Sequence, residues 1–123
     1  MARILIIDDD PQIRTMLRMM LEREGHEVTE APDGVVGVQE YRKAPFDIVI
    51  TDLLMPEKEG IETIMELKRD YPDVKIIAIS GGGQHLGADN FLRLAQKIGA
   101  QYSLRKPFQR AVLIEMIDKL LES

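Results

Sequence analysis

The chain has 123 residues, of which 45% are hydrophobic and 30% charged, with a formal net charge of −5 and no cysteine. This composition is typical of one folded domain with its own core, and it excludes a disulfide framework, a thiolate metal site and a disordered chain. Because the sequence has no basic cluster longer than a pair and no apolar run of about 18 residues, we expect one cytoplasmic domain over residues 1–123 that binds neither nucleic acid nor a membrane.

The chain opens with a strand followed by a helix. Residues 3–7 (RILII) are continuously apolar, which is typical of a short strand buried on both faces. The acidic run 8–10 ends this strand, and Pro11 after it predicts the first turn of a helix with Asp10 as its N-cap and Gly25 at its end. Apolar residues at helical spacing predict the core-facing side of that helix: Ile13, Met16, Leu17, Met20 and Leu21.

The central strand of the chain follows a more polar one. Residues 26–30 (HEVTE) predict a strand at the edge of the sheet, and residues 35–41 predict a short helix. Residues 46–52 (FDIVITD) are mostly aromatic or β-branched and lack helical spacing, so they predict a fully buried strand. This strand stops at a single carboxylate, Asp52, and a short loop closed by Pro56 comes next.

The second half of the chain repeats the alternation. We expect helices over residues 60–70, 90–98 and 109–121, and strands over residues 74–79 and 102–104. Five strands alternating with five helices predict an α/β doubly wound fold, a three-layer sandwich with a parallel sheet. We expect the flavodoxin-like strand order 2-1-3-4-5, one of the two common solutions. The first helix of this half places four residues on one face: Ile61, Ile64, Met65 and Lys68.

Polar side chains stand at the ends of four predicted strands: Asp8 and Asp9, Asp52, Ser80 and Lys106. Because the carboxyl ends of parallel strands share one edge, these residues should converge there. Two carboxylates about 4 Å apart repel by about 4 kcal/mol at an effective dielectric of 20, and Mg²⁺ would relieve the repulsion through oxygen ligands. Lys106 and Ser80 can stabilise a tetrahedral oxyanion, and Asp52 is the central nucleophile. The pattern predicts a metal-assisted phosphoryl site.

Four segments carry a resemblance to a known family. ILIIDDD (4–10), DIVITDLLMP (47–56), IIAIS (76–80) and LRKPF (104–108) resemble the acidic pair, phosphoacceptor strand, hydroxyl strand and lysine–proline turn of two-component response regulator receiver domains, including single-domain chemotaxis regulators. Each motif is weak alone, but all four in order are highly specific. The resemblance covers essentially the whole chain.

The resemblance implies a role for each acidic residue. Asp52 would accept a phosphoryl group from a sensor histidine kinase, a phosphotransfer protein or a small phosphodonor. Asp9 and Asp52 would bind Mg²⁺ directly together with the backbone carbonyl of Leu54, and Asp8 would act largely through water. The domain would be a signalling switch rather than a turnover enzyme, and it would pass its signal to a downstream effector protein.

The resemblance also implies roles for residues on the last two strands. Ser80 would hydrogen-bond the phosphoryl group, Lys106 would form its counter-charge, and the peptide bond before Pro107 would be cis. Receivers usually carry a Tyr or Phe that swings inward on phosphorylation at the position of Ser103, and here the aromatic stands next door at Tyr102. Adjacent strand residues point to opposite faces, so Tyr102 does not simply substitute for the missing aromatic.

A second departure from the family pattern lies after the fourth strand. Ser80 is followed by Gly81, Gly82 and a third glycine in a long connection, where backbone angles closed to other residues are permitted. We hypothesise that this connection and the helix over 90–98 form the switch, ordered when Ser80 contacts the phosphoryl group.

Two other functions compete with the phosphoryl switch. A pseudo-receiver would bind proteins as a scaffold without phosphorylation, and the intact acidic residues with Lys106 argue against it. A flavodoxin-like cofactor binder would need a phosphate-cradling first loop, and this loop is acidic. The sequence leaves open the kinase, the effector, the oligomeric state (a homodimer included) and whether the chain is one receiver of a longer protein.

Overall fold

The computed structural model describes residues 2–53, 59–80 and 88–122, within which five strands alternate with five helices. The strands are β1 (Arg3–Ile7), β2 (Glu27–Ala31), β3 (Ile48–Asp52), β4 (Ile76–Ser80) and β5 (Tyr102–Arg105). The helices are α1 (Pro11–Arg23), α2 (Gly34–Lys43), α3 (Glu59–Asp70), α4 (Ala88–Lys97) and α5 (Arg110–Glu122). Every predicted element is present, with bounds shifted by a few residues at most, as is usual at frayed element ends.

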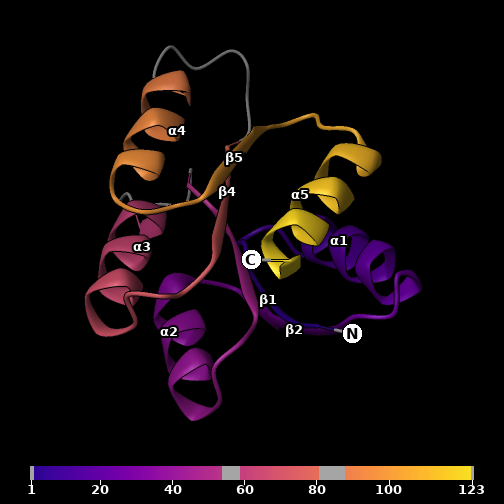
Figure 1. The fold of residues 1–123 in the computed structure, drawn as a ribbon, viewed down its shortest axis with the longest axis horizontal. Helices are drawn as coiled ribbons and strands as arrows, with labels where there is room; N and C mark the ends of the chain where they lie inside the picture. The colour runs from indigo at the N-terminus through magenta and orange to yellow at the C-terminus, as the bar shows by residue number, and fades with distance from the viewer. Residues whose placement is uncertain (1, 54–58, 81–87, 123) are drawn as a thin grey trace.

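The strands form one parallel sheet in the order β2-β1-β3-β4-β5, which confirms the predicted topology. Figure 1 shows α1 and α5 on one face of this sheet and α2, α3 and α4 on the other. β2, the most polar strand, lies at an edge as expected. The parallel arrangement directs the carboxyl ends of all five strands to the same side of the molecule.

The core consists of two apolar layers separated by the sheet. Ile4, Ile6 and Ile50 face α1 and α5, whereas Leu5 and Val49 face α2, α3 and α4. All five residues of β3 and of β4 are buried, which explains why these strands are continuous apolar runs without alternation.

The predicted core-facing sides of α1 and α3 were partly wrong. Met16 and Met65 remain 43% and 54% exposed, whereas Leu17, Leu21 and Ile64 are fully buried. Each methionine is a sequence neighbour of a buried residue and is therefore rotated about 100° from it around the helix axis. A helix that packs on a sheet buries only a narrow stripe, and the two methionines lie at the border of that stripe.

Aspartates fix the starts of the first two helices. The Asp10 carboxylate accepts a hydrogen bond from the Gln12 backbone N–H at 2.8 Å, so Asp10 is the expected N-cap of α1. Asp33 caps α2 in the same way through the Val36 N–H. The first of these caps places α1 directly beside the acidic end of β1.

In the parts of the chain that the structure describes, no helix has both the length and the apolar character needed to cross a membrane.

Candidate functional site

The carboxyl edge of the sheet gathers residues from four strands. Asp8 follows β1, Asp52 is the last residue of β3, Ser80 is the last residue of β4, and Lys106 follows β5. Asp52 is paired in register with Ile79, the residue before Ser80, and the backbone N–H of Lys106 donates to the carbonyl of Ser80 at 2.8 Å. Residues up to 98 positions apart in sequence therefore meet at one edge, as the predicted parallel topology requires.

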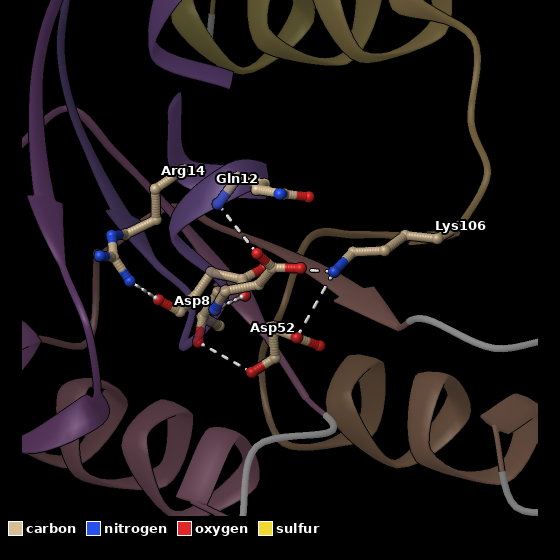
Figure 2. A network of polar contacts seen from close by, with 7 residues as sticks. Asp8, Gln12, Arg14, Asp52 and Lys106 are labelled. Atoms are coloured by element: carbon tan, nitrogen blue, oxygen red, sulfur yellow. Dashed lines mark hydrogen bonds and ion pairs between the residues drawn. The ribbon is translucent and has the colours of Figure 1, made fainter. Parts of the chain in front are cut away.

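Three carboxylates form a tight cluster there, and Figure 2 shows two of them, Asp8 and Asp52, beside Lys106. Oxygens of Asp8, Asp9 and Asp52 all lie within 4.8 Å of one another. Asp8 and Asp52 are only 2% and 7% exposed, whereas Asp9 is exposed to solvent. The Lys106 ammonium lies 3.2 Å from Asp8 Oδ2 and 3.5 Å from Asp52 Oδ2. One cation thus faces three anions, and the local charge remains negative.

This donor set fits Mg²⁺. The ion prefers oxygen ligands at 2.0–2.1 Å, so ligand oxygens around it lie about 3 to 4 Å apart. The three carboxylates come close to that spacing, and small side-chain rotations would complete it. Both Asp8 oxygens accept hydrogen bonds, Oδ1 from the Asp10 N–H and Oδ2 from Lys106, and the same lysine also contacts Asp52 Oδ2.

Burial raises the pKa of Asp8 above its ordinary value of 3.8, and the neighbouring charge of Asp52 acts in the same direction. The hydrogen bond from the Asp10 backbone and the charge of Lys106 lower the Asp8 pKa but do not reverse the shift. Since the folded-state pKa is the higher one, protonated Asp8 contributes stability that is fully present below pH 3.8 and is lost as pH rises through the folded pKa. Ionised Asp8 therefore destabilises the fold at neutral pH.

We predict that Asp8→Asn raises the melting temperature at pH 7 in EDTA, because the neutral amide removes this electrostatic cost. The difference from wild type should shrink as pH falls through the raised folded-state pKa of Asp8, because wild-type Asp8 then becomes protonated. Thermal melts of both proteins across this pH range measure the effect. A variant less stable than wild type at pH 7 would contradict the assignment of Asp8 as a destabilising charge.

Ser80 contributes a hydroxyl without a partner. Within the described residues, its Oγ is the buried side-chain polar atom that makes no hydrogen bond. Leaving a buried polar atom unsatisfied costs about 1–3 kcal/mol, which is retained most readily where a ligand supplies the partner. An acceptor oxygen brought to this edge of the sheet would satisfy it.

Some of the remaining predicted site residues lie on or after β5, and the others lie outside the described residues. The peptide bond between Lys106 and Pro107 is cis. The Ser103 hydroxyl accepts a hydrogen bond from Gln96 Nε2 of α4 at 2.8 Å, whereas Tyr102 packs in the apolar layer under α1 and α5. The two side chains thus point to opposite faces. The last three predicted site residues, which are Leu54, Gly81 and Gly82, lie outside the described residues.

Gly60 is a site residue that sequence reasoning missed. A Cβ atom at this position would lie 2.3 Å from the carbonyl oxygen of Asp52 and 2.6 Å from the Cα of Leu53. The first turn of α3 therefore packs directly on the backbone that carries Asp52. The only signal in the sequence was a glycine near a helix start, a position that glycine can occupy for many reasons.

Comparison with known proteins gives a consistent result. Residues 4–118 match the family model of the response regulator receiver domain. The chemotaxis protein CheY of Thermotoga maritima is 37% identical over 96% of each chain, and the response regulator receiver protein CpdR of Brucella abortus is 34% identical over 98% of each chain. A crystal structure of a response regulator receiver domain protein from Clostridium thermocellum superposes with a TM-score of 0.89 at 33% identity, covering 99% of this chain and 95% of that one.

Proposed function

The chain belongs to the response regulator receiver domain family, which confirms the resemblance seen in its motifs, and from this premise we propose that Asp52 accepts a phosphoryl group in the presence of Mg²⁺. The observation that carries the proposal is the position of Asp52. Its carboxylate is almost fully buried at the end of the central strand, beside Lys106 and within the carboxylate cluster.

The transfer is a displacement at phosphorus. A carboxylate oxygen of Asp52 forms a bond to phosphorus while the P–N bond of a phosphohistidine breaks, and the electron pair of that bond returns to the imidazole nitrogen. With acetyl phosphate, a P–O bond breaks instead. The ammonium of Lys106 balances the negative charge on the phosphoryl oxygens, and the unsatisfied hydroxyl of Ser80 donates to one of them.

Three carboxylates would hold the metal. Asp9 and Asp52 would be its direct ligands, and Asp8 would act through water. When bound, Mg²⁺ supplies positive charge to the phosphoryl oxygens and lowers the repulsion between the carboxylates. The backbone carbonyl of Leu54 completes the proposed set.

The signal would travel along β4 and β5 to α4. The Ser80 carbonyl accepts a hydrogen bond from the backbone N–H of Lys106, which directly follows β5, and on β5 itself the Ser103 hydroxyl accepts from Gln96 of α4. Engagement of the Ser80 hydroxyl by a phosphoryl group would shift this unit and change the surface presented by α4. The partners would be a histidine kinase or phosphotransfer protein as donor and an effector protein as reader.

The proposal is tested by incubating the protein with acetyl phosphate or phosphoramidate and measuring its intact mass. We expect a gain of about 80 Da, one phosphoryl group per chain in the chemistry of an aspartyl phosphate, which forms with MgCl₂ and not with EDTA. Borohydride reduction and peptide mapping should place the modification at Asp52. If neither donor gives an adduct although Mg²⁺ binds, the chain acts as a pseudo-receiver scaffold.

A further inference from the structure

Arg14 connects α1 to the acidic end of β1. It is the fourth residue of α1, and its side chain is 18% exposed. Its Nη1 donates a hydrogen bond of 2.7 Å to the backbone carbonyl of Asp8, which a dashed line marks in Figure 2. The guanidinium therefore binds the main chain of the cluster rather than one of its carboxylates.

A second contact fixes the guanidinium from the opposite side. Arg14 Nε donates to Glu30 Oε1 on β2 at 3.2 Å, and the other Glu30 oxygen accepts from Arg18 Nη1 at 2.7 Å. Glu30 is mostly buried, with 23% of its side chain exposed. The fork of an arginine reaches the two acceptors with separate nitrogens, Nη1 and Nε, whereas a lysine has a single nitrogen to place between them.

The charge of Arg14 is already balanced where it lies. Arg14 and Arg18 share Glu30, and Arg18 also pairs with Glu22 at 3.3 Å, so two cations meet two anions. The influence of Arg14 on the carboxylate cluster is therefore mainly geometric.

Arg14 fixes the orientation of the peptide unit between Asp8 and Asp9. The Asp8 N–H donates to the carbonyl of Ala31 at 3.1 Å, and the Asp8 carbonyl accepts from Arg14, so this residue is held on both sides. Rotation of the peptide unit would move the backbone of Asp9, whose exposed side chain has little packing to hold it in place.

We infer that Arg14 is a positioning residue of the phosphoacceptor site. Its guanidinium links the Asp8 carbonyl to Glu30 and thereby sets the orientation in which Asp9 would coordinate Mg²⁺. The inference rests on the proposed function, since it assigns a role within the same metal site. Groups that orient metal ligands from outside typically change metal affinity by 10–100-fold when they are replaced.

The test compares Arg14→Lys with Arg18→Lys. Both variants keep a positive charge beside Glu30, but only the first removes the nitrogen that bonds to Asp8. We expect the Mg²⁺ dissociation constant of Arg14→Lys, measured by calorimetry, to rise about 10-fold, and the Mg²⁺ concentration giving half the maximal phosphorylation rate to rise equally. At saturating Mg²⁺ the rate should return to that of wild type. Arg18→Lys should match wild type throughout.

A metal-free measurement accompanies the titration. In EDTA, the amide NMR signals of residues 8–10 should shift in Arg14→Lys and not in Arg18→Lys, because the peptide orientation changes before any ion binds. The inference is wrong if Arg14→Lys binds Mg²⁺ as wild type does, or if saturating Mg²⁺ fails to restore its rate. Absence of Mg²⁺ binding or phosphorylation in wild type would instead refute the proposed function.

Discussion

Asp52→Asn should abolish the phosphoryl adduct completely with both acetyl phosphate and phosphoramidate. The asparagine amide is nearly the same size as the carboxylate, but its oxygen carries no full negative charge and does not attack phosphorus. Because Asp52 is buried at the end of β3, no other described residue stands at the same place to replace it. Intact mass after incubation with MgCl₂ measures the loss directly.

A matched control separates loss of the proposed nucleophile from loss of acidic charge. Asp10 lies next to the cluster and caps α1, and asparagine caps helices as well as aspartate does. Asp10→Asn therefore removes one negative charge nearby and should be phosphorylated like wild type. An adduct of full stoichiometry on Asp52→Asn would show that another residue is the acceptor.

The same variant tests the proposed path to α4. Phosphorylated wild type should show altered hydrogen exchange in α4 and at the β5 residues around Ser103, because the Gln96–Ser103 bond couples the two elements. Asp52→Asn treated with the phosphodonor should exchange like the untreated protein. Equal exchange in phosphorylated and unphosphorylated wild type would refute a switch through α4.

The fold and most of the site could be predicted because they depend on local patterns and one rule of topology. β3 and β4 are predicted as strands because full burial makes them continuous apolar runs. The parallel strand order then brings Asp8, Asp52 and Lys106 to one edge of the sheet. The helix start at Pro11 followed from capping chemistry between neighbouring residues.

What the sequence did not reveal depends on contacts between side chains and backbone of different elements. Nothing local pairs Arg14 with both Glu30 and the Asp8 carbonyl, or Ser103 with Gln96. The exposure of Met16 is set by how narrow a stripe α1 buries against the sheet, and helical spacing alone does not give that width. The close approach of α3 to the Asp52 backbone is another contact of this kind, and it leads to the second large effect.

Gly60→Ala should destabilise the protein, although helix propensity predicts the opposite. In a helix interior, alanine is favoured over glycine by about 1 kcal/mol. Here the added Cβ would lie 2.3 Å from the Asp52 carbonyl oxygen and 2.6 Å from the Leu53 Cα. Both atoms belong to the backbone, so no side-chain rotation relieves the clash, and either α3 or the end of β3 must move.

Overpacking of this kind typically costs 1–3 kcal/mol, which outweighs the gain in propensity, and we expect a net loss of about 1–2 kcal/mol in the free energy of unfolding measured in urea. Displacement of β3 should also slow phosphorylation of Asp52, since positioning supplies most of the catalysis in phosphoryl transfer. Glu62→Ala, an exposed position of the same helix, should leave both properties unchanged. A Gly60→Ala protein that is more stable than wild type would mean that helix propensity dominates and that α3 does not hold Asp52 in place. The position of Asp52 therefore depends on the absence of a side chain from the helix that follows it.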